Sequence, residues 1–97
     1  MNWSFYDTQE LRSQIDEVDN QIITLLEQRV QIAKQIGELK TKLKVEVYNP
    51  QREEEILKRL QSISSLSPAQ IEMIYQSIFT LTKVLQEENQ WSLPPLP

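Results

Sequence analysis

One apolar seam constrains the fold of this chain more than any other feature. Between residues 8 and 43 its positions step alternately by four and three, the spacing of a helix that buries one stripe against other helices. Nine of the ten are Leu, Ile or Val, and the tenth is an arginine: Leu11, Ile15, Val18, Ile22, Leu25, Arg29, Ile32, Ile36, Leu39 and Leu43. Such a helix is ~54 Å long, whereas a compact chain of this size has a radius of gyration near ~13 Å. We therefore expect a partner subunit to cover the seam.

Arg29 places a permanent positive charge in the middle of the seam. Burying a guanidinium without an anion costs several kcal/mol, so a negative group must meet it. That group is either a carboxylate of the protein or an anionic ligand. The pattern alone leaves both interpretations open.

The composition limits the partners and the catalytic groups that this chain can use. Ten basic against fourteen acidic residues give a net charge of −4, which argues against nucleic acid or an anionic membrane as the main partner. The chain has no Cys and no His, so thiolate nucleophiles, imidazole bases and the usual zinc sites are excluded. We expect no metal and no cofactor. Any anion site must be a local cluster of positive side chains.

The chain indicates one cytoplasmic, all-α domain. The first residues lack the basic start and apolar run of a signal peptide, and no stretch approaches the length of a membrane span. A single Gly among 97 residues, with many Leu, Ile, Gln, Glu and Lys, is typical of a helical protein. That glycine, Gly37, lies inside the first helix. Close approach of another backbone or of a ligand would explain it.

Capping signals predict three helices, at about residues 8–43, 50–62 and 67–88, in one domain that spans residues 8–88. The expected caps are Asp7 with Glu10, Asn49 before Pro50, and Ser67 with Gln70. Residues 1–7 form a leader, and the proline-rich residues 89–97 form either a ligand for a proline-binding module or a terminal stub.

Apolar spacing also predicts the inner faces of the two shorter helices. In the second helix we expect this face to hold Ile56, Leu57, Leu60 and Ile63. In the third helix the three-four spacing selects Ile71, Ile74, Ile78, Leu81 and Leu85.

Two cations of the first helix define a candidate site. Arg29 and Lys40 are three helical turns apart, so they share a face ~16 Å apart and could hold a small ligand between them. Lys40 by itself also fits a solvated lysine at a helix end. Arg12 lies ~25 Å from Arg29 along the same helix, and by itself it fits a surface residue. In an antiparallel pairing of two long helices, Arg12 could approach the site of the other subunit.

The shorter helices add polar groups to this inventory. Arg52 and Glu53 occupy the first turn of the second helix, and Thr82 and Gln86 lie one turn apart on an otherwise apolar stripe of the third. Thr82 and Gln86 are either a buried hydrogen-bonded pair or ligand contacts. Together these side chains suit a small dianion whose reaction needs positioning and charge stabilisation without covalent help.

From Thr8 to Glu88 the chain resembles the chorismate mutases of the all-helical, intertwined-dimer type. The matching motifs begin with Leu11-Arg12, Ile15-Asp16 and Asp19, continue with Leu26-Glu27-Gln28-Arg29 and Ile36-Gly37-Glu38-Leu39-Lys40, and end with Tyr48-Asn49-Pro50-Gln51-Arg52-Glu53, Thr82 and Gln86. The resemblance implies a three-helix protomer in an interlocked homodimer. It also implies a monofunctional enzyme that rearranges chorismate to prephenate in phenylalanine and tyrosine biosynthesis.

The resemblance also implies a role for each site residue. Arg29, Arg12 of the other subunit and Arg52 would hold the two carboxylates of chorismate, and Thr82 would add a hydrogen bond to one of them. Lys40 and Gln86 would donate to the ether oxygen, and Glu53 would accept from the ring hydroxyl.

Two of the residues that the resemblance assigns to substrate binding, Asn49 and Thr82, depart from the family pattern. Asn49 stands where the family commonly has Asp, and Thr82 stands where Ser is common. Related activities therefore stay open, namely rearrangement of the 4-amino analogue of chorismate or cleavage of isochorismate by a lyase. A third alternative is a non-catalytic helical dimerisation module, which explains the seam but not the charge within it.

Overall fold

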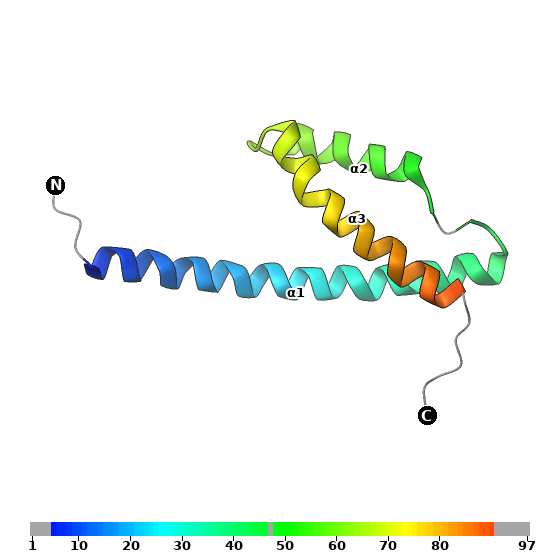
Figure 1. Ribbon diagram of the computed structural model, residues 1–97, viewed down its shortest axis with the longest axis horizontal. Coiled ribbons are helices and arrows are strands. Elements are labelled where there is room, and N and C mark those ends of the chain that lie inside the picture. Colours follow the sequence, from blue (N-terminus) through cyan, green and yellow to red (C-terminus); the bar gives the residue numbers. More distant parts are fainter. Residues whose placement is uncertain (1–4, 47, 91–97) are drawn as a thin grey trace, which may run out of the picture. The chain divides into compact units, whose positions relative to one another are not determined.

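The protein folds into three helices, α1 (Phe5–Leu43), α2 (Pro50–Ile63) and α3 (Pro68–Gln90) (Figure 1). This computed structural model describes residues 5–46 and 48–90, with side chains at 7–46 and 48–86, and these residues include no strand. The prediction of an all-α chain is confirmed. The chain divides within α1 into two units, Met1–Gln31 and Ile32–Pro97, each considered by itself. The proline-rich stretch 91–97 lies outside the described residues.

The N-terminal unit is the first part of α1. The helix begins at Phe5, before the predicted cap, so the prediction of Asp7 as the N-cap is wrong. Asp7 lies instead in the first turn, where a carboxylate interacts favourably with the positive end of the helix dipole.

The apolar seam remains at the surface of the single chain. Its nine apolar residues are between 41% and 64% exposed: Leu11, Ile15, Val18, Ile22, Leu25, Ile32, Ile36, Leu39 and Leu43. Arg29 is half-buried. The chain therefore leaves its longest apolar stripe uncovered, as its length led us to expect.

The C-terminal unit has its small core elsewhere. Ala33 and Gly37 are buried on α1, one helical turn apart and outside the seam. α2 packs against α3 and contributes the buried Ile56. α3 contributes Ile71 and Phe79. From the turn after α2, α3 runs back towards the C-terminal part of α1 (Figure 1).

Three of the predicted inner residues are exposed in the single chain, so their burial within one protomer is not confirmed. They are Ile63 at 70%, Ile74 at 50% and Leu81 at 44% exposure. On α3 the buried stripe is rotated towards Phe79 and Gln86, and away from Ile74 and Leu81. The Tyr75 ring packs edge-on against Phe79, with centroids 5.6 Å apart.

Both predicted caps of the shorter helices are confirmed. Asn49 Oδ1 accepts a hydrogen bond from Arg52 N at 3.1 Å, and Pro50 follows as the first helical residue. Ser67 and Gln70 form a reciprocal capping box, in which Ser67 N donates to Gln70 Oε1 and Gln70 N donates to Ser67 Oγ. Within the described residues, no helix is both long enough and apolar enough to cross a membrane.

Candidate functional site

Gln86 on α3 is a buried polar residue, 7% exposed. Its Nε2 donates to the main-chain oxygen of Ala33 on α1 at 3.3 Å. In an α-helix the same oxygen also accepts from the N–H of residue 37, which here is the buried Gly37. Because glycine has no Cβ, the side of this carbonyl is open to a group from another helix. The structure thus accounts for the glycine inside α1.

Lys40 follows Gly37 by about one turn and is half-buried. Its own carbonyl accepts from Val45 N at 3.1 Å, and Lys44 N donates to Thr41 O at the same distance. This pair of bonds is a Schellman motif, which ends α1 with Lys44 in the left-handed conformation at φ 58°. The motif fixes the backbone that carries Lys40.

Thr82 is half-buried on α3, one turn before Gln86. Its hydroxyl donates to the Ile78 carbonyl at 2.9 Å. A hydroxyl has one proton to donate. Thr82 must therefore turn away from Ile78 to donate to a ligand carboxylate.

Asn49 positions Arg52 and Glu53 at the start of α2 through two hydrogen bonds. The Asn49 side chain accepts from Arg52 N, and its carbonyl accepts from Glu53 N at 3.3 Å. Glu53 is half-buried in the first turn of α2. Arg52 is exposed and forms a 3.5 Å ion pair with Glu55. An exposed pair of this kind is worth little, so a ligand carboxylate can compete with Glu55.

Six predicted site residues belong to the C-terminal unit: Lys40, Asn49, Arg52, Glu53, Thr82 and Gln86. The hydrogen bond from Gln86 to Ala33 links α3 to α1. A contact between Lys83 and Tyr48 links α3 to the connection before α2. Sequence reasoning missed both contacts, because neither follows from the spacing along one helix.

The other two predicted residues, Arg12 and Arg29, lie in the N-terminal unit. Arg12 is exposed and Arg29 is half-buried. Among the described residues, no group of three or more acidic side chains could hold a metal ion.

These observations define a small all-helical protein with cationic and amide side chains at the ends of its helices. The sequence model described as "Chorismate mutase type II" matches residues 11–87. The chain belongs to this family, which confirms the resemblance noted in the sequence.

Known proteins agree with this assignment. A chorismate mutase from Helicobacter pylori, solved in complex with prephenate, is 33% identical and superposes with a TM-score of 0.80 over 89% of this chain and 96% of its own. A bifunctional chorismate mutase/prephenate dehydratase from Aquifex aeolicus is 41% identical over 54 residues, which cover 56% of this chain and 15% of the relative. A chorismate mutase from Methanocaldococcus jannaschii is 37% identical over 54 residues, 56% of this chain and 54% of the relative.

Proposed function

We propose that this protein is a chorismate mutase, an isomerase that converts chorismate to prephenate. The observation that carries the proposal is the family match over residues 11–87, which includes every predicted site residue. The aligned chain spans only part of the two curated relatives, so their names do not by themselves assign its activity. A cytoplasmic location, expected from the sequence, is part of the same proposal.

This reaction needs positive side chains and hydrogen-bond donors around the substrate. Chorismate carries two carboxylates, and its ether oxygen gains negative charge as the carbon–oxygen bond breaks. In our assignment Arg29, Arg52 and Arg12 of the second subunit hold the carboxylates. Lys40 and Gln86 donate to the ether oxygen. Donors that are already oriented towards developing charge lower the barrier because they do not reorganise during the reaction.

Three further residues complete the assignment. Glu53 accepts from the ring hydroxyl, and Thr82 donates to a carboxylate after turning from Ile78. Asn49 stands where a substrate contact is expected, but its side-chain oxygen caps α2. Its contribution is therefore to hold the amides of Arg52 and Glu53 in place. A contact between Asn49 and chorismate would be made in addition to this hydrogen bond.

We further propose an interlocked homodimer in which each site takes Arg12 from the second subunit. Two observations support this proposal. The nine apolar seam residues are exposed in the single chain, and apolar surface of this extent marks an interface. Arg12 also lies ~25 Å from Arg29 along the same helix, too far for both side chains to hold one small ligand within a single chain.

A direct assay tests the activity. Purified protein should consume chorismate, followed by loss of its absorbance, and should form prephenate in equal amount. The 4-amino analogue and isochorismate should be poorer substrates under the same conditions. Faster turnover of either analogue would assign the related activity instead. Binding and dimerisation without turnover of any of the three would favour the non-catalytic module.

A further inference from the structure

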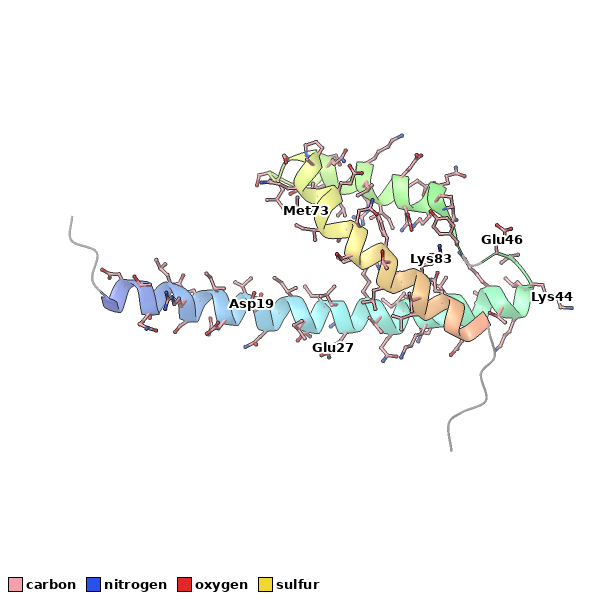
Figure 2. The ribbon with its side chains drawn as sticks, viewed as in Figure 1. Asp19, Glu27, Lys44, Glu46, Met73 and Lys83 are labelled. Atoms are coloured by element: carbon pink, nitrogen blue, oxygen red, sulfur yellow. The ribbon has the colours of Figure 1, made fainter. Side chains whose placement is uncertain are left out.

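The side chains of Lys83 and Tyr48 form a cation–π pair. Lys83 Nζ lies 4.6 Å from the centroid of the Tyr48 ring, well inside the ~6 Å over which the ring attracts a cation. Lys83 lies on α3 (Figure 2), and Tyr48 belongs to the connection between α1 and α2. Both residues are in the C-terminal unit.

The pair joins two parts of the proposed site. Tyr48 immediately precedes Asn49, which accepts hydrogen bonds from the amides of Arg52 and Glu53. Lys83 immediately follows Thr82 on α3. A contact between Tyr48 and Lys83 therefore adds to the packing of α2 on α3 by joining the residue before the α2 cap to α3.

Side-chain burial does not hold the described part of the connection. Each of its described residues, 44–46, 48 and 49, is exposed. Exposed stretches of this kind open locally at low free-energy cost. The Schellman motif fixes the end of the connection next to α1. At the other end the Asn49 cap joins the connection to α2, and the Tyr48–Lys83 pair joins it to α3.

We propose that Tyr48 and Lys83 are positioning residues that hold Arg52 and Glu53 at the substrate site. The proposal rests on the mutase function proposed above. It assigns no contact with chorismate to either residue. Arg52 and Glu53 bind groups that do not react, so a loss of positioning should weaken ground-state and transition-state binding alike. Such a loss raises KM and leaves kcat nearly unchanged.

Four single substitutions and one double substitution test the pair kinetically. Tyr48→Leu and Lys83→Met each remove the cation–π contact, and each should raise KM about two- to fivefold, the range expected for an exposed pair. Tyr48→Phe and Lys83→Arg keep the contact and should retain a KM near that of the wild type. The double variant Tyr48→Leu/Lys83→Met should be no worse than either single variant, because both remove the same interaction.

Lys58→Met is the matched control. Lys58 is an exposed lysine on α2, and its loss changes the net charge by the same amount as Lys83→Met without touching Tyr48. A normal KM in this control excludes a general charge effect. If Lys83→Met raises KM while Tyr48→Leu does not, Lys83 acts by its charge alone and the proposal is overturned. Additive effects in the double variant overturn it as well.

Hydrogen exchange gives a readout that does not depend on activity. The amides of Arg52 and Glu53 should exchange about two- to fivefold faster in Tyr48→Leu and Lys83→Met, but not in Lys58→Met. Unchanged exchange of both amides would overturn the positioning role even in an active enzyme. If the wild type shows no mutase activity, faster exchange would still establish the contact, and the failure would belong to the proposed function.

Discussion

Gln86 and Ala33, 53 positions apart in the chain, are joined by a hydrogen bond from the side-chain amide of one to the main-chain carbonyl of the other. The bond uses one of the two N–H groups of Gln86. In the proposed mechanism the second N–H donates to the ether oxygen of chorismate. The bond to Ala33 then orients the amide in advance, as an electrostatic mechanism requires.

Gln86→Glu should make activity depend on acid. A carboxylate cannot donate to the Ala33 carbonyl or to the ether oxygen, and burial raises the pKa of a carboxyl group. The variant should lose about 10²–10³ in kcat at neutral pH and recover as the pH falls and the carboxyl gains its proton. The wild type should show no such rise. Its pH–rate profile checks this directly, and steep acid activation of the wild type would count against the role of Gln86.

The stability of Gln86→Glu should depend on pH in the same direction as its activity, and it should improve as the pH falls. A buried carboxyl group has a higher pKa in the folded state than its value of ~4.3 in the unfolded state. It destabilises the fold above pH ~4.3, and the free-energy cost grows with pH until the folded-state pKa is reached. The deficit in melting temperature relative to the wild type should therefore shrink as the pH falls. A deficit that is independent of pH would show that the new carboxylate is solvated.

Lys40→Ala should lower kcat by about 10²–10³, the usual loss for one oriented donor to developing charge. The fold should survive, because Lys40 is half-buried beside the seam and fills no core position. Circular dichroism and kinetics on one preparation separate the two effects. The exposed Lys42→Ala is the control and should be fully active. Normal turnover by Lys40→Ala would refute its assignment.

Gly37→Ala tests the close contact at the Ala33 carbonyl. In an exposed helix this change stabilises by about 1 kcal/mol. Here the added methyl group enters a buried contact, where overpacking costs about 1–3 kcal/mol. We expect a lower melting temperature and a lower kcat, because the Gln86 amide would be displaced. The exposed Gln35→Ala should be nearly neutral in both measurements. A gain in stability with full activity would show that α3 does not approach Gly37 closely.

Lys44→Gly should stabilise the protein. Lys44 has φ 58°, a left-handed conformation that costs an L-residue about 1–2 kcal/mol and glycine almost nothing. Greater flexibility of glycine in the unfolded chain offsets part of this gain, so we expect a net gain of about 0.5–1 kcal/mol. Urea denaturation at one fixed protein concentration measures it. Lys42→Gly, inside α1, should instead destabilise by about 1 kcal/mol.

A mixed dimer tests the shared site. Arg12→Ala and Arg29→Ala should each be nearly inactive as homodimers. After unfolding and refolding a 1:1 mixture, about half the dimers are mixed, and each carries one intact site and one with both lesions. Activity should recover to roughly a quarter of the wild type.

The same mixture without unfolding is the control, and it should stay inactive while interlocked subunits exchange slowly. A site built from one chain would give no recovery, because each chain keeps its own lesion. Verified mixed dimers without activity would therefore reject the interlocked site, although the mutase assignment could survive.

The sequence by itself determined the features that depend on neighbours along the chain. Asn49 before Pro50, and Ser67 three residues before Gln70, fixed the starts of α2 and α3, because a capping hydrogen bond closes within one turn. The first helix was the exception. A cap and a first-turn acid have similar sequence signals, and Asp7 is the latter.

Only the tertiary structure decided which helical faces meet. Periodicity shows which residues share a face, but not which face finds a partner within the chain. α1 meets α3 at the Ala33 carbonyl, buries Ala33 and Gly37, and leaves the longer seam exposed, while α3 buries Gln86 and leaves Ile74 exposed. Ala33 and Gly37 have small side chains, so the α1 backbone there is open to the Gln86 side chain of α3, whereas a row of Leu, Ile and Val side chains suits packing against the helices of the proposed second subunit. That difference in side-chain size is the physical reason for the choice.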